Sequence, residues 1–254
     1  LISSQLDMDR LDYLRRDSFF TGVTEGNIGS ARIIKMLNVV EDSLVVESKG
    51  IYSIENYLTS RRLMYWQVYL HKTAVAYEKV LINALKRAKY LVQQGKQLFC
   101  PPALKYFLHN TIDRYWFQNH AEALTMYEQL DDTDIWCTLK VWQNSEDKIL
   151  SLLAKDMINR NVFKVEVREK PVTEEEIYAL KDNIAKHFSI TFDDATYLMS
   201  VNTIQKDMYD INDDKIAILY KDGTLKDISE ASEILNVELL SKKISKYYLC
   251  YQRF

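Results

Sequence analysis

Five polar residues near the beginning of the chain have a spacing that is suited to chemistry. If residues 3–22 (SSQLDMDRLDYLRRDSFFTG) form a helix, each residue advances about 100° around its axis. One face of this helix then carries Asp9, Asp12, Tyr13, Arg16 and Asp17, and leucines lie opposite. Three carboxylates, a guanidinium and a phenol on one face are able to hold a metal ion and a polyphosphate, and they are also compatible with exposed surface.

The alternative to a binding site is an ordinary solvated helix face. Asp12 and Arg16 are four residues apart, a spacing that stabilises an exposed helix by about 0.2–0.5 kcal/mol. Three carboxylates on one face repel each other unless a cation lies among them, which favours a site. We expect Ser3 or Ser4 to cap this helix and Gly22 to end it in the left-handed conformation.

Two motifs resemble those of a known enzyme family. The run LDMDRLDYLRRDSFFTGV is similar to the last motif of HD-domain phosphohydrolases, in the branch of deoxynucleoside triphosphate triphosphohydrolases that includes the sterile-alpha-motif/HD enzyme. Members carry D-x-D-[KR]-x-D-Y-x-x-R-D before a turn with T-G-V or similar. The run SRRLMYWQVYLHK resembles the R-x7-Y-x-H-K helix of the same family. The resemblance covers residues 3–72 well and the helices to residue 163 loosely.

The resemblance implies a metal site and a phosphate site. The metal-binding aspartate of the family corresponds to Asp9, and two phosphate-binding positions correspond to Arg10 and Arg61. Carboxylate and imidazole ligands suit several divalent ions, so Zn, Mn, Fe, Mg and Ni are not distinguished. Family members cleave at the α-phosphorus and release a deoxynucleoside and intact triphosphate, so the expected substrate is a dNTP similar to dGTP.

The resemblance also implies a sugar site and an effector site. Tyr13 and Tyr69 correspond to tyrosines that pack on the sugar, and Asp17 corresponds to the carboxylate that binds the 3′-hydroxyl. Arg32 and Lys72 lie near positions that contact an activating nucleotide between subunits, which implies a homo-oligomer. The chain departs from the family at residues 26–29, where Gly-Asn-Ile-Gly replaces a G-x-F-D loop.

The remaining metal ligands of the family, a His and a His-Asp pair, precede this motif. The chain has four histidines, and none of them is followed by Asp. We therefore expect this chain to be the C-terminal part of a longer protein, with the H…HD motif upstream. The resemblance then implies that no catalytic residue lies within the chain and that the chain alone is inactive.

Composition excludes several classes of function. The chain has 254 residues, an apolar fraction of 47% and a net charge of −3, so a broad nucleic-acid footprint is not expected. No apolar run is long enough to span a membrane, and no signal peptide is visible. Three cysteines far apart argue against a disulfide framework and predict a reducing, cytoplasmic location.

The first 160 residues predict helices and one hairpin. The hairpin is expected over residues 39–46, and residues 53–94 contain no Gly or Pro. They predict one long helix or two pieces broken near Ser60. An aromatic stripe along this segment favours a core role for Tyr65. Further helices are expected at 31–37, 102–110, 119–130, 133–143 and 146–160.

The last 94 residues have a different pattern. Strands are expected at 163–169, 195–203, 215–220 and 245–251, with helices at 173–187 and 228–235. This β-α-β-β-α-β order is typical of a ferredoxin-like sandwich. The expected fold is therefore mainly α, with the C-terminal part of a helical HD domain and a small hairpin in residues 1–160. An α+β subdomain follows in residues 161–254.

The motifs lead to one hypothesis and two alternatives. The hypothesis is a metal-dependent dNTP triphosphohydrolase-like enzyme of the HD type that binds a nucleotide substrate. The first alternative is a catalytically silent, nucleotide-responsive regulatory or oligomerisation protein on the same scaffold. The second is an HD phosphohydrolase that acts on another phosphate ester, because a fold does not determine its substrate.

Overall fold

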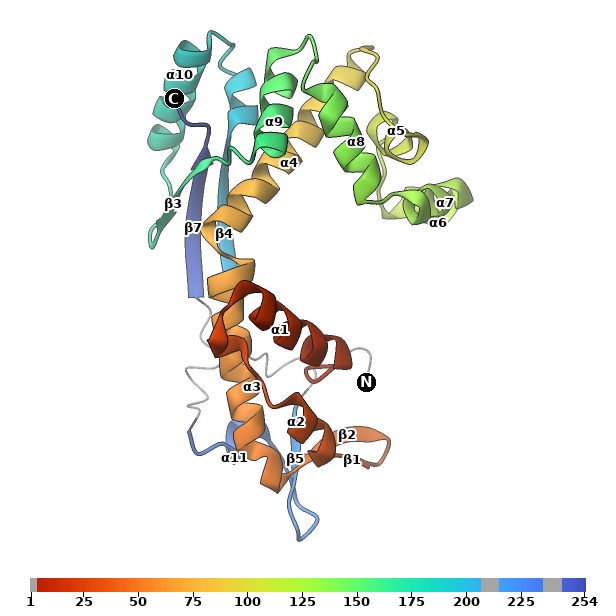
Figure 1. Cartoon of the computed structure of the whole chain (residues 1–254), viewed down its shortest axis with the longest axis vertical. Helices are drawn as coiled ribbons and strands as arrows, with labels where there is room; N and C mark the ends of the chain where they lie inside the picture. The colour runs from red at the N-terminus through yellow and green to blue at the C-terminus, as the bar shows by residue number, and fades with distance from the viewer. Residues whose placement is uncertain (1–3, 207–214, 235–243) are drawn as a thin grey trace. The chain divides into compact units, whose positions relative to one another are not determined.

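The computed structural model describes residues 4–206, 215–234 and 244–254, and Figure 1 labels its elements along the chain. Contacts divide the chain into two compact units. Unit 1 comprises Leu1–His71 and Ile204–Ser245, and unit 2 comprises Lys72–Thr203 and Lys246–Phe254. This division does not follow the expected boundary between residues 160 and 161, so domains at 1–160 and 161–254 stay a prediction.

Unit 1 begins with the helix that carries the polar face. Helix α1 (Met8–Thr21) is capped by Asp7, whose carboxylate accepts a hydrogen bond from the main-chain N of Arg10 at 2.7 Å. The expected cap at Ser3 or Ser4 was therefore wrong for Ser4, and Ser3 lies outside the described residues. Gly22 ends the helix at φ 72°, as expected, because glycine adopts the left-handed region without a Cβ clash.

Three further α-helices and a small sheet belong to the described part of unit 1. They are α2 (Ser30–Met36), α3 (Ile51–Met64), α11 (Ile228–Ala231), β1 (Leu37–Val40), β2 (Ser43–Glu47), β5 (Ala217–Leu219) and β6 (Leu225–Asp227). The expected hairpin is formed by β1 and β2, which are antiparallel. Strand β5 runs parallel to β2 and antiparallel to β6, which gives the order β1-β2-β5-β6. The helix expected at 228–235 corresponds to α11, and its expected last residue, Leu235, lies outside the described residues.

The core of unit 1 packs α1 against α3 and the sheet. Buried apolar residues from α1, α2, α3, β2 and β5 meet there: Leu11, Leu14, Ile33, Val46, Ile54, Tyr57, Leu58, Met64 and Ile218. A 3₁₀ turn (Thr24–Gly26) approaches this core closely. A Cβ on Gly26 would lie 2.3 Å from the Sδ of Met64, so only glycine fits there without movement.

The long helix expected from residues 53–94 is interrupted at a different place. Helix α3 continues into a five-residue π-helical segment, Tyr65–Tyr69, and α4 (Lys72–Gln93) follows. The main-chain N of Leu70 donates to the carbonyl of Tyr65 at 2.7 Å, which is the i to i+5 bond of a π-helix. The expected break near Ser60 was therefore wrong, because Ser60 is buried within regular α3. Single π-helical turns occur often at functional sites.

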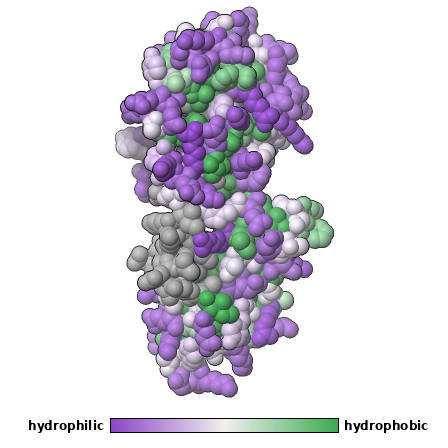
Figure 2. Space-filling model, turned by 90° about the vertical axis from the view of Figure 1, so that its left-hand side faces the viewer, coloured by the Kyte–Doolittle hydropathy of each residue, from purple (hydrophilic) through white to green (hydrophobic). Residues whose placement is uncertain are grey.

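Unit 2 contains most of the helices. They are α5 (Pro102–His109), α6 (Arg114–Asn119), α7 (Ala121–Gln129), α8 (Asp132–Trp142), α9 (Lys148–Asn159) and α10 (Glu174–Phe188), together with α4. Helix α4 lies along α9 and buries an apolar stripe against it. The face in Figure 2 is mostly hydrophilic, with hydrophobic residues in small groups. In the described residues, no helix is both long and apolar enough to cross a bilayer.

The expected α+β portion at the C-terminus is confirmed, but its strands do not form one ferredoxin-like sheet. Strands β3 (Lys164–Arg168), β7 (Ile244–Tyr251) and β4 (Met199–Lys206) form a second sheet in the order β3-β7-β4. Strands β5 and β6 instead join the hairpin β1-β2. The expected order β-α-β-β-α-β missed β6, which lies between β5 and α11, and the strand expected at 195–203 begins only at Met199. Strand partners also depend on long-range contacts that alternation does not encode.

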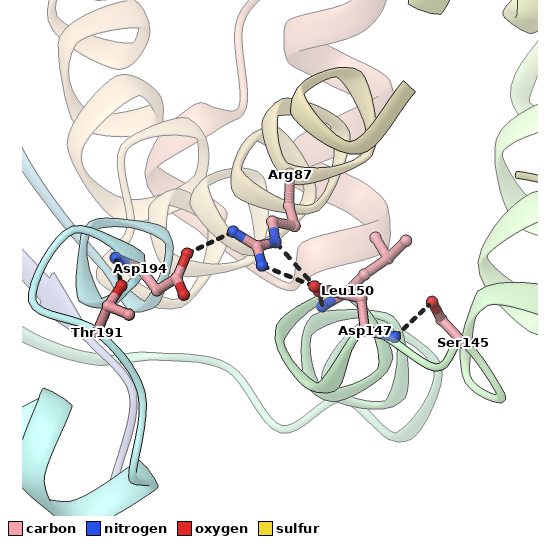
Figure 3. Close-up of polar contacts among 6 residues, drawn as sticks. All are labelled: Arg87, Ser145, Asp147, Leu150, Thr191 and Asp194. Atoms are coloured by element: carbon pink, nitrogen blue, oxygen red, sulfur yellow. Dashed lines mark hydrogen bonds and ion pairs between the residues drawn. The ribbon is translucent and has the colours of Figure 1, made fainter. Parts of the chain in front are cut away.

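A buried charge cluster joins three segments of unit 2. The side chain of Arg87 on α4 is 8% exposed, and its guanidinium contacts two carboxylates (Figure 3). It donates to Asp147 at 3.1 and 2.6 Å and to Asp194 at 2.5 Å. Asp147 also caps α9 by accepting from the main-chain N of Leu150 at 2.8 Å. The cluster therefore ties α4, the start of α9 and the segment around residue 194 together.

Candidate functional site

The two predicted phosphate-binding arginines are both held by the segment that precedes α1. Nη1 of Arg10 donates to the carbonyl of Ser4 at 3.0 Å, and Nε lies 3.3 Å from Oδ2 of Asp7. Nη1 of Arg61, on α3, donates to Oε1 of Gln5 at 2.8 Å. Because residues 4–7 contact both guanidiniums, two cationic groups 51 positions apart in the sequence lie at the same end of α1.

Tyr57 marks the meeting point of these arginines. Its ring is fully buried on α3, and its hydroxyl donates to the main-chain carbonyl of Gln5 at 2.6 Å. Burial raises the pKa of Tyr57, whereas the nearby positive charges of Arg61 and Arg10 oppose this rise. Both guanidiniums are thus close enough to act on one phenol. Two adjacent cations of this kind are suited to bind a polyphosphate.

The predicted sugar-binding residues also come together. The rings of Tyr13 on α1 and Tyr69 in the π-helical segment are 5.9 Å apart in an edge-to-face arrangement. The hydroxyl of Tyr69 donates to Oδ2 of Asp17 at 2.8 Å. Tyr65 completes the group, with its ring centroid 5.3 Å from that of Tyr69. The structure therefore unites Tyr13, Asp17 and Tyr69 across 52 positions of sequence.

The phenols of Tyr13 and Tyr69 are held in the protonated form. Burial is the largest cause that raises the pKa of Tyr13, and the neighbouring Tyr65 adds to it. Burial also raises the pKa of Tyr69, and the hydrogen bond to the Asp17 carboxylate raises it further. At neutral pH both hydroxyls therefore stay protonated and do not abstract protons, and the Tyr69 hydroxyl uses its proton in the bond to Asp17.

Asp9, the predicted metal ligand, lies on the exposed side of α1. In the described residues no group of three or more His, Cys, Asp or Glu side chains is arranged to hold a metal ion. One exposed carboxylate does not bind a divalent ion selectively, because metal sites in proteins use several converging ligands. The described residues therefore do not by themselves fit a metal centre, and the metal role of Asp9 stays a prediction.

The rest of the polar face of α1 is ordinary surface. Arg16 donates to Oδ2 of Asp12 from Nη2 at 2.7 Å and from Nε at 3.1 Å, and the two side chains are 54% and 66% exposed. This is the pair that the i,i+4 spacing predicts. The five-residue face thus divides into an exposed side and a half-buried side that carries Tyr13 and Asp17.

The predicted effector residues have few contacts. Arg32 on α2 is exposed, and its guanidinium donates to the carbonyl of Lys49 at 3.5 Å. Lys72 is exposed and is the first residue of α4. No contact here distinguishes an effector site from surface, so the roles of Arg32 and Lys72 stay a prediction.

Sequence reasoning missed three members of the site. Gln5 and Tyr57 lie outside both motifs, and no pattern in the sequence singles them out. Tyr65 was interpreted as core, but its ring is only partly buried and lies 5.9 Å from the guanidinium carbon of Arg61. Its position four residues after Arg61 and four before Tyr69 was the available signal, because i,i+4 residues share a helix face.

Comparison with known proteins agrees with the motifs in part. Residues 28–97 match the family described as HD associated region. A phosphohydrolase from Bacteroides thetaiotaomicron, known from a crystal structure, is 62% identical and superimposes with a TM-score of 0.94. That match covers 100% of this chain and 63% of the other. Residues 28–97 are therefore similar to HD associated regions, and the chain closely shares the fold of that protein.

Two further relatives match this chain with lower sequence identity. The Bacillus subtilis protein YwfO is 34% identical over 249 residues, which is 96% of this chain and 54% of YwfO. A deoxynucleoside triphosphate triphosphohydrolase SAMHD1 homolog from Dictyostelium discoideum is 28% identical over 98 residues, 39% of this chain and 19% of that protein. This chain spans about half the length of YwfO, so the activity of the whole protein is not fixed by these residues alone.

Proposed function

We propose that this chain belongs to a metal-dependent HD-type phosphohydrolase that hydrolyses a dNTP to deoxynucleoside and triphosphate. One observation carries the proposal. Helices α1 and α3 and the π-helical segment after α3 bring two arginines and a tyrosine–aspartate pair together within unit 1. Arg10 and Arg61 flank Tyr57, and Tyr13 contacts Tyr69, which donates to Asp17. The name of the Bacteroides relative supports a phosphohydrolase, and the Dictyostelium relative supports a dNTP substrate.

Each group has a separate part in the proposed reaction. Arg10 and Arg61 bind the negatively charged phosphate oxygens, and charge-assisted hydrogen bonds of this kind contribute about 1.5–3 kcal/mol each. Tyr13 and Tyr69 pack against the deoxyribose, and Asp17 accepts a hydrogen bond from its 3′-hydroxyl. Hydrolysis adds water oxygen to the α-phosphorus and breaks its bond to O5′, which releases deoxynucleoside and intact triphosphate.

The proposal needs more than the described residues supply. Within them, Asp9 has no partner ligands with which to form a metal centre. We propose that Asp9 is one ligand of a divalent ion, that the others and the proton-transfer groups lie outside this chain, and that the chain alone is inactive. A bound ion would polarise a phosphoryl oxygen. Its identity, a homo-oligomeric state and a cytoplasmic location stay predictions.

Product analysis of the natural full-length protein tests this proposal. The protein is incubated with dGTP and a divalent ion, and products are separated by anion exchange. We expect deoxyguanosine and tripolyphosphate in equal amounts. Pyrophosphate or orthophosphate as the first product would contradict the dNTP triphosphohydrolase assignment. Nucleotide binding without any product would favour the catalytically silent regulatory protein, and turnover of another phosphate ester would favour the second alternative.

A pair of aspartate variants tests the metal role. Asp9→Ala is expected to abolish turnover and to lower the bound metal, measured by elemental analysis of the purified protein. Asp12→Ala is the matched control, because it removes an exposed carboxylate from the same helix and only its pair with Arg16 is lost. Equal metal content in Asp9→Ala and the natural protein would exclude Asp9 as a ligand.

A further inference from the structure

The side chain of Gln5 connects the segment before α1 to a proposed phosphate-binding residue. Gln5 is 6% exposed, and its Oε1 accepts the hydrogen bond from Nη1 of Arg61 at 2.8 Å. Its main-chain carbonyl accepts from the hydroxyl of Tyr57 at 2.6 Å. Tyr57 and Arg61 are four residues apart on α3, so Gln5 is fixed to one face of that helix at two points.

The two arginines differ in the charge of their partners. Arg10 has a carboxylate beside it, because its Nε lies 3.3 Å from Oδ2 of the buried Asp7. Arg61 has the neutral amide of Gln5, and in the part of the chain that the structure describes it forms no ion pair. A neutral acceptor orients a guanidinium and leaves its full positive charge, whereas a carboxylate also offsets part of that charge.

We propose that Gln5 is a positioning residue that orients Arg61 for a polyphosphate group without neutralising it. This inference rests on the proposed function, because it assumes that Arg61 contacts phosphate. Gln5 does not contact substrate in this account and acts only through Arg61. In this account both the acceptor oxygen and the neutrality of Gln5 are required. The oxygen accepts one N–H of the guanidinium, and the four other N–H groups stay able to donate to an anion.

A purely structural role makes a different prediction. If Gln5 only anchors α3, then a glutamate in its place would hold Arg61 more strongly and would leave anion binding unchanged. If Gln5 also preserves the charge of Arg61, the same substitution would keep the contact and weaken the anion site. Gln5→Glu therefore separates the two roles, and the volume-conserving Gln5→Met removes the acceptor without adding a charge.

The test measures binding of inorganic tripolyphosphate to the natural full-length protein by calorimetry, in EDTA so that no metal contributes. We expect Gln5→Glu to raise the Kd about tenfold or more, since it places a carboxylate beside Arg61. Gln5→Met should raise the Kd about three- to fivefold, because one oriented hydrogen bond is lost. Gln129→Met, at an exposed position on α7, is the matched control and should leave the Kd unchanged.

A double-mutant cycle shows whether Gln5 acts through Arg61. In an Arg61→Met background, Gln5→Met should have no further effect on the tripolyphosphate Kd. An effect of Gln5→Met that adds fully to that of Arg61→Met would overturn the proposal, and so would a Gln5→Glu variant that binds as tightly as the natural protein. Urea unfolding of every variant identifies those that are misfolded, and if the glutamate variant does not fold, the cycle of Gln5→Met with Arg61→Met still decides whether Gln5 acts through Arg61.

The same measurements keep the two proposals distinguishable. If the natural protein binds neither tripolyphosphate nor dGTP, the proposed function fails and the role of Gln5 fails with it. If the natural protein binds tripolyphosphate and loses affinity in Arg61→Met but not in either Gln5 variant, only the positioning role fails. Loss of affinity in all three variants supports both.

Discussion

Arg87 in unit 2 and Arg61 in unit 1 are both partly or fully buried arginines on long helices, and they are paired in opposite ways. Arg87 is surrounded by carboxylates and donates to Asp147 and Asp194. Burial alone would lower the pKa of Arg87, but the hydrogen bonds to the two aspartates outweigh it and raise that pKa. Arg61 donates instead to the neutral oxygen of Gln5.

The difference teaches which arginine is available to a ligand. A guanidinium enclosed by two carboxylates has its charge cancelled and most of its donors used, so it stabilises the fold. A guanidinium held by an amide keeps its charge, and the remaining N–H groups are not committed to carboxylates. We therefore expect Arg87 to stabilise unit 2, and we propose that Arg61 is the arginine available to an anion in unit 1.

The largest expected effect is on stability, at Arg87. Arg87→Met removes the partner of two partly buried carboxylates, and breaking a buried pair on one side costs about 3 kcal/mol. The free energy of unfolding is measured in urea, because guanidinium salts would screen the charges. Arg16→Met is the control, since its exposed pair with Asp12 should contribute less than about 0.5 kcal/mol. Equal losses in both variants would contradict the assignment.

The second effect is on binding, at Arg61. Arg61→Met should raise the Kd for tripolyphosphate about tenfold to a hundredfold, because a charge-assisted contact worth about 1.5–3 kcal/mol is removed. The same variant should lose much less stability than Arg87→Met, since no buried carboxylate loses its partner. If Arg61→Met destabilises unit 1 by as much as Arg87→Met destabilises unit 2, the distinction between the two arginines is wrong.

The smallest effect is a pH dependence at a buried carboxyl of unit 2 that has no arginine. Asp156 on α9 is buried, Oδ2 has no hydrogen-bond partner in the described residues, and burial raises its pKa to about 6. Its pKa in the unfolded chain is about 3.9. Between these values the folded state binds the proton and the unfolded state does not, so stability falls as pH rises from about 4 to 6.

Asp156→Asn should remove this dependence. The variant gains about 1–2 kcal/mol of unfolding free energy relative to the natural protein when pH is raised from 4 to 7, because an amide has no charge to bury. Urea unfolding at several pH values measures the difference. A constant difference between the two proteins across this range would show that Asp156 does not titrate on folding in the way described.

Much of the fold was predictable from local patterns. Neighbouring residues explain the end of α1 at Gly22 and the β1–β2 hairpin. They also explain the capping box at the start of α10, in which the side chains of Thr173 and Glu176 each accept a hydrogen bond from the main-chain N of the other residue. The break after α3 was not predictable, because nothing in the run YWQVY differs in propensity from a regular helix. The division of the C-terminal strands between two sheets depends on pairing across more than 150 residues.

The candidate site shows the same limit. The structure brings together Tyr13, Asp17 and Tyr69, which the motifs named as one group, and their sugar-binding role stays a prediction. The motifs did not show that Asp9 faces solvent or that Asp7 caps α1, since both depend on what packs against the helix. Gln5 has no motif at all, and its role emerges only from its contacts.

The sequence by itself determined most of the helical segments, several of their caps and the motif residues that we propose bind a nucleotide, because these depend on residue type and short spacing. Only the tertiary structure decided which arginine faces a carboxylate and which faces an amide. The pairings of Arg61 and Arg87 join residues 56 to 107 positions apart, and the charge left on each guanidinium depends on the partner that folding brings to it.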